Sequence, residues 1–243
     1  LFAPLSAMAF APAPIAISGT VAPWVLTPPM TCSAIMRPFP LGESLPTNLC
    51  KFSVFVPPHE VGAKMPVVWY LSGLTCSQAN VTEKGEFRAA CAKHGLIFIA
   101  PDTSPRGEGV ADDPDGAYDF GLGAGFYVNA TQAPWSRHYH MYDYVLDELP
   151  SLIEATFPVS DKRAITGHSM GGHGALVKAL RNPGRFTSVS AFSPINNPVN
   201  CPWGKKAFTA YLGTDESTWA EYDASILMAK ATDHVPALVD QGD

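Results

Sequence analysis

The stretch "RAITGHSMGGHGALVKALRN" (163–182) joins a short strand, Arg163–Thr166, to a helical segment, Gly174–Asn182. Between them, residues 167–171 match the pattern G-x-S-x-G, which in this context is typical of a sharp turn that exposes a serine at the edge of a sheet. A glycine-rich turn with a chance serine is the alternative interpretation of so short a pattern. The strand before it and the helix after it favour Ser169 as a nucleophile.

A nucleophilic serine also needs hydrogen-bond donors for the oxyanion that forms when it attacks a carbonyl. Met170 would place its N–H at the amino end of the helix, where the helix dipole favours negative charge. In "LSGLTC" (71–76), Gly73 directly follows a buried strand and lets the chain fold back over the serine. The sequence therefore predicts an oxyanion hole formed by the N–H groups of Leu74 and Met170.

Short apolar segments alternate with helical segments along the rest of the chain. Strands are expected at Phe52–Pro58, Pro66–Leu71, Leu96–Asp102, Arg163–Thr166, Thr187–Ser193 and Pro236–Asp240, and helices at Lys84–Gly95, Tyr142–Phe157 (kinked at Pro150) and Gly174–Asn182. This alternation predicts an α/β fold with a mostly parallel central sheet and helices on both faces. Reactive groups in such sheets gather at the carboxyl ends of the strands.

Composition limits the classes of protein that this chain can represent. It has 243 residues, 47% of them hydrophobic, which suits a single large domain, and a net charge of −6 argues against a nucleic-acid partner. The five cysteines form no CxxC pair and no zinc-ligand cluster, so we expect reduced thiols in a cytoplasmic protein without metal or cofactor. "GLGAGF" (121–126) has the wrong spacing for a dinucleotide loop and is interpreted as a packed loop lining the site.

The amino-terminal segment differs in character from the rest. Residues 1–36 carry no charge, and six prolines interrupt the apolar run: Pro4, Pro12, Pro14, Pro23, Pro28 and Pro29. Prolines at this density suit neither the core of a secretion signal nor a membrane-spanning helix. We therefore expect residues 1–48 to be a poorly ordered leader, with a targeting segment as the alternative, and residues 49–243 to form the catalytic domain.

From about residue 52 onward the chain resembles the S-formylglutathione hydrolase (esterase D) family of the α/β-hydrolase superfamily. The matching stretches are "WYLSGLTC" (69–76), "APDTSPRG" (100–107), "DFGLGAGFYVNAT" (119–131), "GHSMGGHGAL" (167–176), "SVSAF" (188–192), "CPWGKKAF" (201–208) and "YLGTD" (211–215). The resemblance implies hydrolysis of S-formylglutathione to glutathione and formate, the second stage of formaldehyde detoxification, with Ser169 carrying the formyl group.

The same resemblance implies roles for two further residues. Cys76 would lie close enough to the nucleophile for thiol reagents to interfere, and Trp203 would form an aromatic wall of the acyl pocket. Bulky walls favour a formyl group by excluding larger acyl groups. The implied partner is the small thioester substrate, without nucleic acid or membrane, and a homodimer is left open.

The resemblance weakens where the rest of a catalytic triad should lie. In the family the acid belongs to a D-Q-G-x-x-D pattern; here "DQGD" (240–243) supplies only the start of that pattern, and the family's later histidine segment has no counterpart. His173 and His234 follow Ser169, but neither matches the position of the base. The triad acid and base are thus not present in the chain, which predicts a C-terminally incomplete α/β-hydrolase fold with very low turnover.

Two alternatives to a glutathione-specific thioesterase stay open at this stage. One is a carboxylesterase of broad specificity for short acyl groups, because acyl choice depends on pocket volume. The other is a non-catalytic α/β-hydrolase fragment that binds a ligand or partner, because the groups that would activate Ser169 lie outside the chain.

Overall fold

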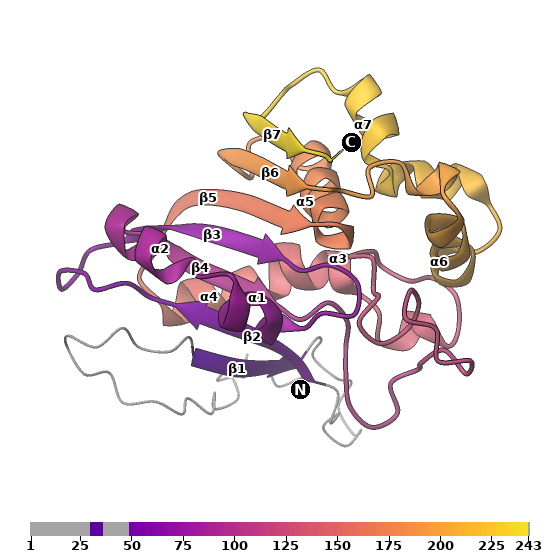
Figure 1. The fold of residues 1–243 in the computed structure, drawn as a ribbon, viewed down its shortest axis with the longest axis horizontal. Coiled ribbons are helices and arrows are strands. Elements are labelled where there is room, and N and C mark those ends of the chain that lie inside the picture. The colour runs from indigo at the N-terminus through magenta and orange to yellow at the C-terminus, as the bar shows by residue number, and fades with distance from the viewer. Residues whose placement is uncertain (1–29, 36–48, 243) are drawn as a thin grey trace, which may run out of the picture.

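The computed structural model describes residues 30–35 and 49–242, and this part of the chain is organised around one seven-stranded sheet (Figure 1). The strands are β1 (Met30–Ile35), β2 (Leu49–Phe55), β3 (Met65–Leu71), β4 (Ile97–Pro101), β5 (Val159–His168), β6 (Ser188–Phe192) and β7 (Ala237–Asp240), in the order β1-β2-β4-β3-β5-β6-β7. β1 and β2 pair antiparallel, as do β2 and β4, whereas every pairing from β4 to β7 is parallel. The predicted mostly parallel sheet is confirmed.

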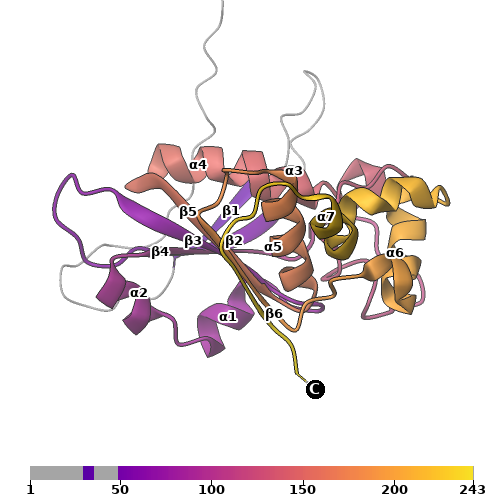
Figure 2. The ribbon, with the colours of Figure 1, turned by 90° about the horizontal axis from the view of Figure 1, so that it is seen from above.

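Helices cover both faces of this sheet, as the alternation of segments predicted (Figure 2). The α-helices are α1 (Gln78–Lys84), α2 (Arg88–His94), α3 (Met141–Asp143), α4 (Leu149–Thr156), α5 (Met170–Arg181), α6 (Pro202–Leu212) and α7 (Ala224–Lys230). Short 3₁₀ turns occupy Trp135–Arg137, Pro198–Asn200 and Glu216–Tyr222. α1 and α2 lie on the face opposite α4.

The central strand β3 shows why the sheet needs both layers. Val67, Trp69 and Leu71 are fully buried on one face, in the large apolar cluster that includes residues of α4 and α5. Val68 and Tyr70 point to the other face and pack against a smaller cluster that includes Phe98 and residues of α2. Strand side chains alternate between faces, so β3 is apolar on both sides because both sides are covered.

The helix expected at Lys84–Gly95 needs correction. The structure has two helices there, α1 and α2, separated by Gly85 and by Glu86 with a φ of +43°. A capping box between Ser77 and Asn80 starts α1 well before the expected residue. The predicted stop at Gly95 is correct, because Gly95 caps α2 in the left-handed conformation at φ +63°.

The kink expected at Pro150 takes the form of a π-helical turn. Tyr144–Glu148 is π-helical and leads into α4, which holds Pro150 in its first turn. A proline has no N–H to donate to the carbonyl four residues earlier, which is that of Leu146. Arg185 donates to the Leu146 carbonyl instead, so the irregular turn leaves that acceptor satisfied.

Part of the amino-terminal segment belongs to the sheet. β1 lies within the expected leader and pairs with β2 at the edge of the sheet. Residues 1–29 and 36–48 lie outside the described residues, so the poorly ordered leader at 1–48 stays a prediction.

Candidate active site

Ser169 lies between the end of β5 and the start of α5, at the carboxyl edge of the sheet. Its φ of +56° and ψ of −118° are strained for a residue with a side chain. The turn is held on both sides, because the Ser169 N–H donates to the Phe192 carbonyl at 2.8 Å and the His173 N–H donates to the Ser169 carbonyl at 3.0 Å. The backbone thus presents Ser169 in one fixed conformation.

The two glycines of the G-x-S-x-G pattern make this conformation sterically possible. A Cβ on Gly167 would lie 2.2 Å from the Gly171 carbonyl oxygen, and one on Gly171 would lie 1.9 Å from the Leu71 carbonyl oxygen. Both distances are far inside van der Waals contact and involve backbone atoms that cannot turn away. The strand–turn–helix geometry that the sequence predicted is present.

The loop after β3, residues 72–76, folds back against Ser169. A Cβ on Gly73 would lie 3.3 Å from the Ser169 Cβ, so glycine allows the close approach. The Thr75 N–H donates to the Gly123 carbonyl at 3.0 Å and the Cys76 N–H to the Gly73 carbonyl at 3.4 Å. Within the described part of the chain, the N–H of Leu74, the residue before these two donors, has no backbone acceptor.

Met170 supplies the other N–H that the sequence singled out. It is the first residue of α5, and the first N–H groups of a helix have no partner within that helix. Its side chain is fully buried, which fixes the start of the helix in place. The structure therefore brings Ser169, Met170 and the Leu74 loop together at one edge of the sheet.

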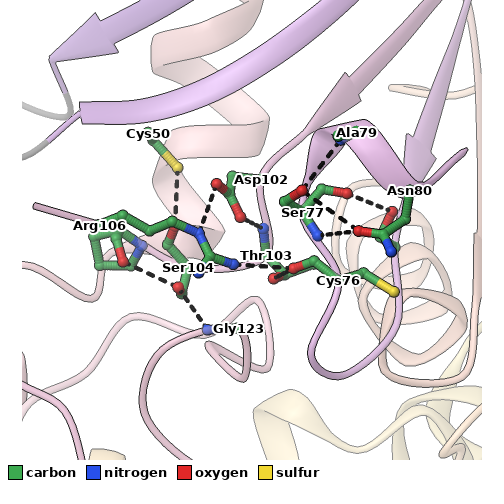
Figure 3. Close-up of polar contacts among 12 residues, drawn as sticks. Cys50, Cys76, Ser77, Ala79, Asn80, Asp102, Thr103, Ser104, Arg106 and Gly123 are labelled. Carbon is green, nitrogen blue, oxygen red and sulfur yellow. Dashed lines mark hydrogen bonds and ion pairs between the residues drawn. The ribbon is translucent and has the colours of Figure 1, made fainter. Parts of the chain in front are cut away.

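The glycine-rich segment 121–126 packs against this loop. A Cβ on Gly123 would lie 3.1 Å from the Thr75 Cα, and the Gly123 N–H donates to Ser104 Oγ at 2.8 Å (Figure 3). The Gly125 N–H donates to the Thr103 carbonyl at 3.1 Å. The segment is a tightly packed support for the site loop, in line with its interpretation as a packed loop.

Cys76 lines a small cavity that reaches His168, the residue before Ser169. The cavity, of about 190 Å³, is also lined by Gly73, Lys84 and His168. Partial burial raises the pKa of the Cys76 thiol, and a backbone hydrogen bond with Gly73 and the charge of Lys84 only partly oppose that shift. The thiol is therefore accessible from the cavity but is protonated at neutral pH.

Trp203 lies in the first turn of α6, which Figure 1 shows beyond the carboxyl ends of the strands. Its side chain is half exposed, at 49%. Its role as an acyl-pocket wall stays a prediction.

Neither histidine that follows Ser169 in the chain is placed as a base. His173 is buried beneath the turn, its Nε2 pairs with the Phe126 carbonyl at 3.1 Å, and burial together with the charge of Lys178 lowers its pKa to about 3. His234 is exposed in the segment between α7 and β7. No hydrogen bond in the described part of the chain joins a histidine to the Ser169 side chain.

The described residues hold neither a metal-binding cluster nor a membrane-spanning helix. Residues 30–35 and 49–242 contain no group of three or more His, Cys, Asp or Glu side chains that is arranged to hold a metal ion. The same residues include no helix with both the length and the apolar character needed to cross a membrane.

The parallel centre of the sheet and the strained serine between β5 and α5 define an α/β-hydrolase, the fold of many serine hydrolases. The family model described as "Putative esterase" matches residues 44–243, and the chain belongs to this esterase family.

Among individual proteins, the chain is similar to S-formylglutathione hydrolases. The S-formylglutathione hydrolase of Mus musculus is 55% identical over 194 residues, which cover 79% of this chain and 68% of the mouse protein. An S-formylglutathione hydrolase from Agrobacterium tumefaciens has a structure that matches with a TM-score of 0.80 and 44% identity, over 93% of this chain and 79% of that one. A fluorophosphonate-binding serine hydrolase from Staphylococcus aureus, 20% identical with a TM-score of 0.63 over 88% of this chain and 79% of that one, shares the fold.

Proposed function

We propose that this protein is a serine thioesterase that hydrolyses S-formylglutathione to glutathione and formate. The observation that carries the proposal is the strained Ser169 at the carboxyl edge of the sheet, with the Leu74 loop folded against it and Met170 beginning the next helix. The 55% identity to the mouse S-formylglutathione hydrolase supports the choice of substrate.

The chemistry runs in two stages, with Ser169 as the group that carries the acyl unit. Ser169 Oγ loses its proton to a base and bonds to the formyl carbon, and the carbonyl electron pair moves onto oxygen as an oxyanion. The N–H groups of Leu74 and Met170 hold that oxyanion. Its collapse breaks the carbon–sulfur bond and releases glutathione as the thiol or thiolate. Water then attacks the formyl ester by the same route and releases formate.

The base that takes the serine proton is not among residues 49–242 in this proposal. A pKa near 3 and an engaged Nε2 exclude His173 from the role, and His234 is exposed on the segment before β7. An extended chain, in which residues 1–243 are followed by a segment with the family's aspartate and histidine, tests this point. We expect the extended chain to turn over S-formylglutathione and the 243-residue chain to show only the residual rate of a donor pair without a base, roughly 10³–10⁴ over water.

A carboxylesterase of broad specificity is the second candidate, because Trp203 and the acyl pocket set the choice of acyl group. The test compares kcat/KM of the extended chain for S-formylglutathione and for a nitrophenyl acetate. A strong preference for the thioester supports the proposed substrate, and equal or better use of the simple ester contradicts it.

The proposal extends to the setting of the enzyme. The proposed reaction needs no metal or organic cofactor, since Ser169, the base and the backbone N–H groups supply its chemistry. The cysteines at 50, 76, 91 and 201 are free thiols, which fits a reducing cytoplasm. A homodimer is part of the same proposal, and sedimentation of the purified protein tests it.

A further inference from the structure

The carbonyl of Cys76 closes the site loop, and two side chains from a different part of the chain donate to it. Arg106 donates from one terminal nitrogen, at 3.1 Å, and Thr103 donates from its hydroxyl (Figure 3). Both belong to the segment that follows β4, 27 to 30 residues away along the chain. The end of the loop that carries Leu74 is therefore fixed from outside the loop.

A buried carboxylate holds these two donors in place. Asp102 is fully buried at the end of β4, accepts from Arg106 Nε at 2.9 Å through one oxygen and from the Thr103 N–H at 2.7 Å through the other. The guanidinium thus spans Asp102 and the Cys76 carbonyl with two of its N–H groups. Asp102 is buried and the Arg106 side chain is 35% exposed, and charge-assisted hydrogen bonds on two sides of the guanidinium make Arg106 a bridge between β4 and the site loop.

The other end of the loop is fixed by a separate contact. Tyr127 donates from its hydroxyl to the Ser72 carbonyl at 2.9 Å. Leu74 therefore lies between two anchored carbonyls, those of Ser72 and Cys76. If either of these hydrogen bonds is lost, the Leu74 N–H can turn away from the direction that an oxyanion requires.

We propose that Arg106 is a positioning residue for the oxyanion hole: through the Cys76 carbonyl it fixes the loop that aims the Leu74 N–H at the carbonyl attacked by Ser169. This inference rests on the proposed function. Arg106 acts without touching the substrate. Its effect falls on the transition state, because the oxyanion exists only there, and so on kcat more than on KM.

The fork of the guanidinium makes the proposal specific to arginine. A lysine at 106 can pair with Asp102 but has no planar pair of N–H groups to reach Asp102 and Cys76 together. Arg106→Lys should therefore retain the fold and the ion pair, yet still lower kcat. Arg106→Ala removes the bridge entirely and leaves a space that a small guanidinium ion can enter.

The experiment measures kcat and KM for S-formylglutathione in the extended chain carrying Arg106→Ala or Arg106→Lys. Complete loss of an oxyanion donor costs roughly 10²–10³ in kcat, so a misdirected donor should cost roughly 10- to 100-fold. We expect KM to stay within about twofold, as for an interaction made only in the transition state. Added ethylguanidinium should restore part of the kcat of Arg106→Ala, and ethylammonium should not.

Two controls separate the possible failures. Arg163→Gln removes another partly buried arginine from an ion pair, with Glu154, in the middle of β5 and away from the loop at 72–76, and should lower the melting temperature without lowering kcat. Ser169→Ala must abolish turnover; if it does not, the proposed function fails. If Ser169→Ala is inactive, two results overturn the positioning role alone. One is that both Arg106 variants keep kcat within about twofold of the parent. The other is that Arg106→Ala loses kcat and ethylguanidinium does not restore it.

Discussion

The two sides of the site differ in how they are built. On the nucleophile side, Ser169 and the loop at 72–76 are held by central strands, buried side chains and backbone hydrogen bonds. On the opposite side, the edge strand β7 exposes Leu238 at 55% and Val239 at 50%. The comparison shows that the turn at Ser169 and the loop beside it rest on the buried centre of the sheet, whereas the edge strand β7 leaves apolar side chains exposed.

The proposed reaction has two separate requirements, donors for the oxyanion and a base for the serine proton. The proposed oxyanion donors are backbone N–H groups whose directions depend on turns, so they need no particular side chain at Leu74 or Met170. A base needs an ionisable side chain, most often a histidine, at one place and in one protonation state. The following predictions test whether the nucleophile side is complete and independent of the edge.

The largest effect is expected for Ser169→Ala in the extended chain. Loss of the nucleophile of a serine triad lowers kcat by roughly 10⁶-fold. Ser193→Ala is the matched control, since Ser193 also has a positive φ, of +44°, at the end of the adjacent strand β6. Steady-state kinetics should show an unchanged Ser193 variant; an active Ser169 variant would place the nucleophile elsewhere.

The next largest effect is expected for Gly171→Ala, which disrupts the packing of the turn that carries Ser169. The new Cβ would lie 1.9 Å from the Leu71 carbonyl oxygen, so β3 and α5 must move apart. We expect a loss of about 3 kcal/mol or more in the free energy of unfolding, the upper range for overpacked sites. Denaturant unfolding measures it. Gly184→Ala, with φ +79° but open space around it, should cost only about 1–2 kcal/mol of backbone strain; equal losses would show that the close approach is not rigid.

The pH dependence of stability tests the burial of His173. Its pKa falls from an ordinary 6.5 to about 3 in the fold because burial disfavours the charged ring. Between these values His173 binds a proton in the unfolded chain but not in the fold. The stability that comes from burying the neutral ring is therefore complete above pH 6.5 and is lost as the pH falls toward 3. The slope reaches up to about 1.4 kcal/mol per pH unit. Unfolding of His173→Gln should lack this component between pH 3 and 6.5; an identical slope in both proteins would mean that His173 is exposed to protons in the fold.

The smallest effect on turnover is expected for Cys76→Ser. The thiol lines the cavity that reaches His168 but has a raised pKa, so it is not the nucleophile at neutral pH. The variant should keep turnover within about twofold and lose sensitivity to thiol alkylation, a reaction of the thiolate. In the parent protein the rate of inactivation by an alkylating agent should still be rising at about pH 9, because the thiolate forms only above the ordinary range. Unchanged sensitivity in the variant would assign the reactive thiol to another position, such as Cys201.

The sequence predicts the parts of this site that depend on neighbours in the chain. Gly167, Ser169 and Gly171 lie within one short stretch, so their spacing alone specifies the turn. The last strand also follows from a local pattern: the sequence predicts it at Pro236–Asp240, and β7 spans Ala237–Asp240.

Features that depend on distant contacts or unusual caps were missed. The start of α1 uses Asn80 in its capping box in place of the usual Glu or Gln, and α6 is capped by the sulfur of Cys201, an uncommon cap. The roles of Thr103 and Arg106 arise only when β4 lies beside β3, which brings their side chains to the Cys76 carbonyl. An arginine shortly after an Asp at a strand end is the one signal in the sequence that points to this bridge.

The most direct test of the whole mechanism is the identity of the residue that carries the formyl group. The extended chain is mixed with S-formylglutathione, quenched in acid during the first turnover, digested, and analysed by mass spectrometry. We predict one formyl group on the peptide that contains Ser169, with none on the Ser169→Ala variant. A formyl group on Cys76, or on any peptide without Ser169, would contradict Ser169 as the nucleophile and with it the oxyanion hole assigned to Leu74 and Met170.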